Sequence, residues 1–193
     1  RQRQMCIRDR AYSKDITKPS DNTLNLTFQH ILTRINFAAK LADSNYTYTV
    51  ESITITGAKG GAATYTFGGT EGKGGNWNIT GSAPASGYSY TFDNTVTAKD
   101  DIYDYTQNNN SLMLYPQSLT DAKITVKYKT EKDNATFFNG SKEVALTGEW
   151  TNGQSIRYIL TLPVGAEKMS VNTTYDEDWN ATDNEQTPKT PVL

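Results

Sequence analysis

The sequence predicts an all-β protein, built as a mostly antiparallel, Greek-key β-sandwich. Tyr and Thr are abundant, and with Val and Ile they are the residues that suit a half-buried pleated surface. From Thr23 onward the apolar residues alternate with a period of two, which places successive side chains on opposite faces of a sheet. These short runs recur about every 8 to 12 residues with turn residues between them, as in a sandwich.

The first expected strands lie between residues 24 and 55. A one-residue phase shift separates Val50 from Ile53 and predicts a bulge within one long strand, which ends at Gly57. A bulge or short helical turn is expected from His30 to Arg34. The alternating positions are Leu24, Leu26 and Phe28; then Ile35, Phe37, Ala39 and Leu41; then Tyr46, Tyr48, Val50, Ile53 and Ile55.

Three more short strands are expected around glycine-rich segments. GAKGGA and GGTEGKGG read as hairpin loops. The second segment does not predict a phosphate-binding loop, because it lacks the Walker spacing and no helix pattern follows it. The apolar positions are Tyr65 and Phe67; Trp77 and Ile79; and Tyr88, Tyr90 and Phe92.

The polar, turn-rich stretch 100–110 predicts a long loop or a seam between two small lobes. Beyond residue 110 apolar and polar residues alternate again. The C-terminal segment 181–193 is expected to be a flexible tail. Residues 23–180 therefore form the expected sandwich unit, with 11–22 as a linker. The later strand positions are Leu112 and Leu114; Ile124, Val126 and Tyr128; Val144 and Leu146; Ile156, Tyr158, Leu160 and Leu162; and Met169, Val171 and Thr173.

Residues 1–10 differ sharply in composition from the rest. They hold four of the six Arg residues and the single cysteine, Cys6. QMCIRDR resembles the translation of an adapter used in DNA sequencing. We therefore expect residues 1–10 to be an artefact that contributes nothing to the fold. The segment carries a net charge of +3, and without it the formal charge of −2 becomes −5.

The charge argues against nucleic acid binding, and the distribution of apolar residues argues against a membrane-spanning helix. A net charge of −2 without clustered Lys and Arg argues against nucleic acid binding. No apolar run approaches the roughly 18 residues that a membrane-spanning helix needs.

The sequence contains no recognisable catalytic, cofactor or metal-binding motif, so we expect no enzyme and no cofactor. The lone His30 has no GxSxG or Cys-His context, and HExxH is absent. The spacing of Asp176, Asp178 and Asn180 resembles the start of a calcium loop but lacks the later Gly and Glu, which leaves only a looser surface calcium site open. Paired carboxylates of a glycosidase would have to come from Asp100, Asp101, Asp104, Asp176, Glu177 and Asp178.

Four segments, in order, resemble the fimbrillin-like proteins of Bacteroidales cell surfaces and fimbriae. They are LNLTFQHILTRINFAAKL, YTVESITITGAKGGAATYTF, LMLYPQSL and LTGEWTNGQSIRYILTL, followed by Asp178 and Trp179. No single segment identifies the family, but the four segments occur in the same order as in the family, and this order is fairly specific to it. The residues that carry the resemblance, all with a structural role, are Phe28, His30, Phe37, Pro116, Gln117, Trp150 and Trp179.

The resemblance implies an exported surface lipoprotein with a transthyretin-like β-sandwich, at the outer membrane or in a fimbrium. Its partners would be other fimbrial subunits, joined by donation of a strand, or surface ligands of host or bacterium, with membrane contact only through an N-terminal lipid anchor. Two features depart from the family: the lipid-bearing Cys is absent, and no Arg lies between Ala11 and Thr33 for proteolytic trimming.

Two alternatives stay open from sequence alone. The protein could be a carbohydrate-binding surface module whose Tyr and Trp side chains stack on sugars, although core packing explains these aromatics more simply. Within the fimbrial hypothesis, it could form a stalk, cap a tip or act alone on the surface.

Overall fold

The computed structural model describes residues 11–13, 28–68, 75–96, 102–106 and 110–175. These residues form strands and no α-helix, which confirms the all-β class, and so none of them forms a helix that could cross a membrane. The predicted adapter, most of the linker, Trp179 and the tail lie outside the described residues. The strands are β1 (Ala11–Ser13), β2 (Phe28–His30), β3 (Thr33–Leu41), β4 (Thr47–Thr56), β5 (Ala63–Thr66), β6 (Asn76–Ile79), β7 (Tyr88–Val96), β8 (Tyr103–Asp104), β9 (Leu112–Leu114), β10 (Lys123–Lys132), β11 (Ala135–Ala145), β12 (Ser155–Leu162) and β13 (Ser170–Tyr175).

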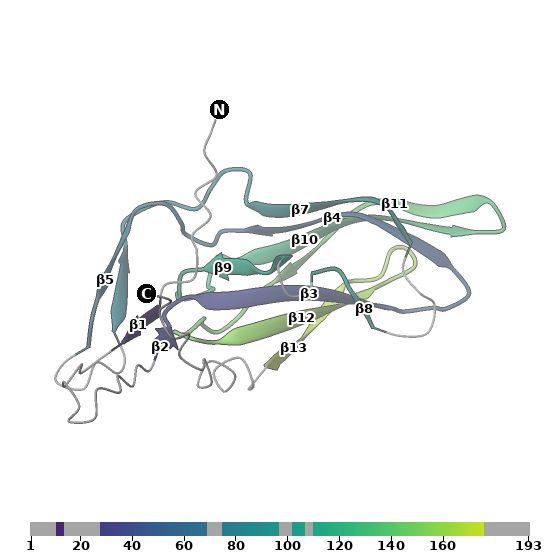
Figure 1. Ribbon diagram of the computed structural model, residues 1–193. Coiled ribbons are helices and arrows are strands. Elements are labelled where there is room, and N and C mark those ends of the chain that lie inside the picture. The colour runs from purple at the N-terminus through teal and green to yellow at the C-terminus, as the bar shows by residue number, and fades with distance from the viewer. Residues whose placement is uncertain (1–10, 14–27, 69–74, 97–101, 107–109, 176–193) are drawn as a thin grey trace, which may run out of the picture.

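Two sheets form the layers of a sandwich (Figure 1). One has the strand order β11-β10-β4-β7, and the other has the order β13-β12-β3, with both β8 and β9 on the far side of β3. The strands pair antiparallel, as predicted, except that β3 and β12 run parallel. Two small ribbons, β1 with β2 and β5 with β6, complete the described structure.

The core lies between the sheets and is rich in aromatic rings. Phe37 of β3 packs edge-on against Tyr90 of β7, with ring centroids 6.2 Å apart, and stacks on Tyr158 of β12 at 6.3 Å. Tyr48 stacks on Tyr128 within the opposite sheet. Tyr128 also donates a 2.8 Å hydrogen bond to the carbonyl of Pro163, which follows β12. The Phe37–Tyr90 contact and the Tyr128–Pro163 hydrogen bond join the two layers.

The bulge predicted in the long strand is present in β4. Val50 pairs with Tyr128 and Ser52 pairs with Lys127, so Glu51 is the extra residue. Val50 and Ile53 are both fully buried because the extra residue returns the later side chains to the core face. Glu51 points outward and forms an ion pair with Lys127 at 2.6 Å.

Three strands were not expected from sequence, or only in part. β1 lies in the segment 11–22 that was expected to be a linker, and it pairs with β2. β11 begins at Ala135, although only Val144 near its end was predicted, because most of its residues are exposed at the sheet edge and show little apolar alternation. β8 lies in the predicted loop 100–110 and pairs with Ala38 and Ala39 of β3. Within the segment from His30 to Arg34 only Ile31 and Leu32 lie outside strands, in a buried bend between β2 and β3 that is not a helical turn.

We predict that Phe37→Ala lowers the free energy of unfolding by about 3 to 5 kcal/mol, because it empties a fully buried position where the sheets meet. Urea unfolding followed by tryptophan fluorescence measures the change. Lys40→Ala, an exposed change in the same strand, is the control and should shift stability by less than about 0.5 kcal/mol. Equal effects of the two variants would contradict this description of the core.

Candidate interaction site at the open edge of the sandwich

The structure places the predicted motif residues in different environments. Phe37 and Trp150 are buried, and His30, Pro116 and Gln117 are half-buried. Phe28 belongs to β2, but its side chain and the whole of Trp179 lie outside the description. At least two of the motif residues, Phe37 and Trp150, therefore belong to the packed core, and the motif residues do not form one polar cluster.

Tyr158 connects several of these residues, although sequence analysis did not select it as a site residue. Its ring stacks on Phe37, and its hydroxyl accepts a 2.8 Å hydrogen bond from Nε1 of Trp150. The backbone N–H of Trp150 in turn donates to the carbonyl of Gln117 at 2.9 Å. The Gln117 side chain bonds to both backbone groups of Lys59, which fixes the loop after β4.

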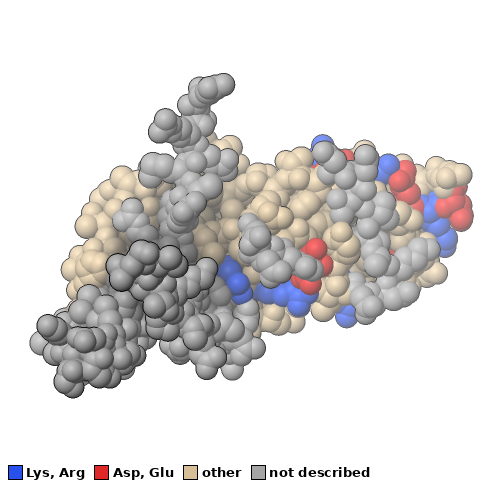
Figure 2. All heavy atoms as spheres, in the orientation of Figure 1, with Lys and Arg blue, Asp and Glu red and all other residues tan. Residues whose placement is uncertain are grey.

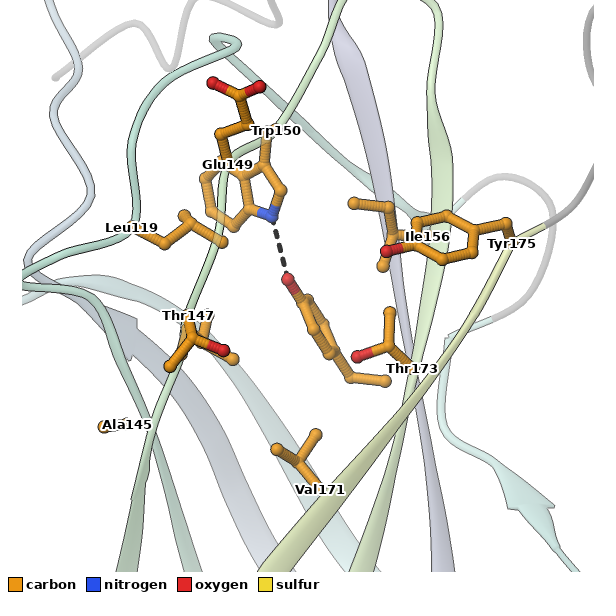
Figure 3. Close-up of a pocket in the computed structure, with 11 residues that line it drawn as sticks. Leu119, Ala145, Thr147, Glu149, Trp150, Ile156, Val171, Thr173 and Tyr175 are labelled. Carbon is orange, nitrogen blue, oxygen red and sulfur yellow. Dashed lines mark hydrogen bonds between the residues drawn. The ribbon is translucent and has the colours of Figure 1, made fainter.

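A pocket of about 130 Å³ opens beside this group, between β13 and the segment 145–150 that follows β11 (Figure 3). Core side chains form its floor, including Leu119, Trp150 and Tyr158. Its rim is polar: Thr147 and Glu149 lie on one side, and Thr173 and Tyr175 on the other. Tyr175 is 60% exposed, so one wall of the pocket is an aromatic ring in contact with solvent.

The Trp150–Tyr158 pair forms a hydrogen-bonded and uncharged part of the pocket floor. Both side chains are nearly fully buried. Burial raises the pKa of Tyr158 to about 12, and the hydrogen bond from Trp150 acts in the opposite direction without cancelling this effect. The phenol therefore stays protonated at neutral pH and accepts the indole N–H, whose burial without a partner would be costly.

The two long edge strands on this side of the sandwich differ in charge. β11 carries Lys142 and Glu143, and charged side chains hinder the addition of another strand to a sheet edge. β13, with the sequence SVNTTY, carries no charged residue. No described strand pairs with its outer edge, so this edge presents backbone N–H and C=O groups with little electrostatic protection.

The described residues of the site include neither paired carboxylates nor a cluster of metal ligands. Glu149 is the one carboxylate among the residues that line the pocket, whereas glycoside cleavage uses two. Within the described residues no group of three or more His, Cys, Asp or Glu could hold a metal ion. The predicted looser calcium site, at residues 176–180, lies outside them.

Exposed aromatics in the described part of the chain do not form a flat platform. Three ring pairs contain an exposed member, and all three are steeply inclined: Tyr46 with Phe137 at 85°, Tyr65 with Phe67 at 89°, and Tyr103 with Tyr105 at 66°. A sugar stacks on exposed ring faces, and none of these pairs presents two coplanar faces. This geometry gives no support to the carbohydrate-binding alternative.

Comparisons with known proteins identify relatives of this chain. Residues 11–179 match the family model described as fimbrillin-like. A fimbrial protein from Bacteroides vulgatus has a similar structure, with a TM-score of 0.56 at 16% identity over 81% of this chain and 57% of that one. A "putative cell adhesion protein" from Bacteroides eggerthii gives a TM-score of 0.44 at 13% identity over 78% and 56%. The chain thus spans less than two thirds of these structures, and no curated protein matches it.

We predict that Tyr158→Phe lowers the free energy of unfolding by about 1 to 3 kcal/mol, because it leaves the buried Trp150 N–H without its acceptor. Tyr158 also gives stability a pH dependence. Its folded pKa of about 12 lies above the roughly 10 of an unfolded tyrosine, so its contribution is complete below about pH 10 and is lost as pH rises toward 12.

Urea titrations between pH 7 and 11.5 measure both effects. Tyr158→Phe should lose less stability above pH 10 than the parent protein does. Tyr175→Phe removes an exposed hydroxyl from the same pocket and should match the parent within about 0.5 kcal/mol. A Tyr158→Phe protein as stable as the Tyr175→Phe control would contradict the assigned hydrogen bond.

Proposed function

Because this chain belongs to the fimbrillin-like family, we propose that it is a structural or adhesive component of bacterial fimbriae that acts by associating with other subunits. The family match over residues 11–179 carries this proposal. The similar β-sandwich of the Bacteroides vulgatus fimbrial protein supports it at the level of the fold. The proposed role needs neither catalysis nor a cofactor.

Strand addition at β13 is the mode of association that the described surfaces favour. β13 is a six-residue outer strand without charged side chains, next to a pocket with an apolar floor. A strand added there would gain backbone hydrogen bonds along β13. The charged β11 edge is a poorer acceptor by the same reasoning.

The proposed location is the bacterial cell surface. Family membership supports export, and a lipid-modified cysteine upstream of Ala11 would provide attachment to the outer membrane. The carbohydrate-binding alternative has weaker support, because the exposed aromatics of the described residues meet edge-on.

We predict that the uninterrupted gene encodes a signal peptide and a lipid-box cysteine upstream of Ala11, in place of residues 1–10. Antibodies raised against this chain should label intact cells of the bacterium that carries the gene, and external protease should remove the signal. A periplasmic protein serves as the control that must stay protected. A cytoplasmic start that retains RQRQMCIRDR would contradict this location.

We also predict that Asn172→Glu reduces assembly about tenfold or more, because it places a charge on the exposed face of β13. Electron microscopy and sedimentation of surface material from cells expressing each variant measure the assembled fraction. Ser141→Glu adds the same charge to an exposed position of β11, opposite Lys127, and should leave assembly unchanged. Strand addition at β13 is wrong if Asn172→Glu cells assemble normally.

A further inference from the structure

The tip of the β10–β11 hairpin presents an exposed phenylalanine at one end of the molecule. Asp133 and Asn134 form the turn with φ values of 50° and 63°, the left-handed geometry that suits a tight hairpin. Phe137 follows on β11 and is 53% exposed. Figure 1 shows this hairpin reaching beyond the remaining strands of both sheets. A large apolar side chain therefore stands at the most projecting described part of the sandwich.

A bulge directs Phe137 outward. Phe138 pairs with Thr130 and Thr136 pairs with Glu131, so Phe137 has no partner on β10. Bulges redirect side chains and recur at functional positions. Phe138 consequently packs on core residue Tyr128, with ring centroids 4.8 Å apart, while Phe137 remains at the surface.

Tyr46 and Lys132 hold Phe137 in place. The rings of Tyr46 and Phe137 meet edge-on at 5.0 Å, and Nζ of Lys132 lies 5.4 Å from the centre of the Tyr46 ring. Asp133 lies at the turn, and Glu131 is already paired with Lys129 at 2.9 Å. Lys132 is thus a cation beside this aromatic tip, and its charge also acts on the nearby carboxylate of Asp43. In Figure 2 charged side chains gather toward the hairpin end of the visible face.

The pocket beside β13 has the size to receive such a side chain between its polar rim and its floor of core residues. A cavity of about 150 Å³ lined by apolar side chains is known to hold a benzene molecule, and this pocket measures about 130 Å³. Its floor is formed by core side chains, and Glu149 on its exposed rim supplies a charge opposite to that of Lys132. The hairpin tip and the pocket are therefore complementary in size and in the charges of Lys132 and Glu149.

We propose that Phe137 of one copy inserts into the pocket beside β13 of a second copy, with Lys132 next to the partner's rim carboxylate. The choice of a second copy as partner rests on the proposed fimbrial function. The contact itself rests on the pocket, the bulge and the paired charges. It is an addition to strand donation, because a side chain and not a backbone edge makes it.

The positions of the hairpin tip and the pocket determine what kind of assembly the contact would form. β11 begins at the tip with Ala135, and its last residue, Ala145, lines the pocket. Eleven extended residues span roughly 35 Å, so the two surfaces lie at opposite ends of one strand. A contact between unlike surfaces that does not close on itself generates an open chain. Copies would follow one another in the direction of β11.

Cross-linking between two differently labelled full-length proteins tests the contact even if it is weak. One protein carries Asn134→Cys at the tip and the other Thr147→Cys at the pocket, both with Cys6→Ser. A short bis-maleimide should join the two proteins into cross-linked heterodimers.

Phe137→Ala in the tip protein should lower the yield of cross-linked heterodimer about tenfold or more, because an aromatic anchor dominates a small contact. The matched control is Phe67→Ala, which removes another exposed phenylalanine and should leave the yield unchanged.

A charge exchange provides the second readout. Lys132→Glu in the tip protein should reduce the yield, and Glu149→Lys in the pocket protein should restore it when the two are combined. Near-ultraviolet circular dichroism confirms that each variant is folded. Equal yields for the parent and Phe137→Ala would overturn the insertion. Asn172→Glu in the pocket protein separates the two ideas: if it abolishes cross-linking while Phe137→Ala does not, strand addition stands and the phenylalanine contact falls.

Discussion

The parallel pairing of β3 with β12 is the constraint on which the rest of this sandwich depends. It joins segments 121 residues apart, as the hydrogen bond from Arg34 to Ser155 shows, and it gives the fully buried Phe37 its stacking partner Tyr158. β12 then positions β13, and the opposite side of β3 pairs with β8 and β9. Without this pairing neither the edge at β13 nor the pocket beside it would exist.

The period-two alternation of apolar residues predicted the strands that have a buried face. It did not predict strands whose side chains are mostly exposed. β3, β4, β10 and β12 were foreseen, including the phase shift in β4, because their core residues leave a period-two pattern in the sequence. The first part of β11 was missed since an edge strand buries little and its pattern is interrupted by the bulge at Phe137. The parallel partner of β3 could not be predicted, because the pattern of a strand does not specify its neighbours.

The candidate site shows the same limit at the level of side chains. Trp150 and Gln117 were selected as motif residues, and they do lie at or beside the pocket, yet as packing and backbone anchors. The roles of Tyr158 and Tyr175 were missed because they depend on which strand borders the segment 145–150. The uncharged sequence of β13 was the one available signal, since a six-residue run without charge at an outer strand indicates an unprotected edge.

The separation between β3 and β12 also affects how this chain reaches its folded state. Most contacts of β3 wait for residues that emerge from the ribosome long after it, and β12 is among the last strands in the described sequence. Chains dominated by such distant contacts fold slowly, because loop closure costs entropy before the contacts form. A nascent chain of this kind stays open during synthesis. Such a delay would suit the export that we propose, because a polypeptide crosses a membrane extended and completes its sheets on the far side.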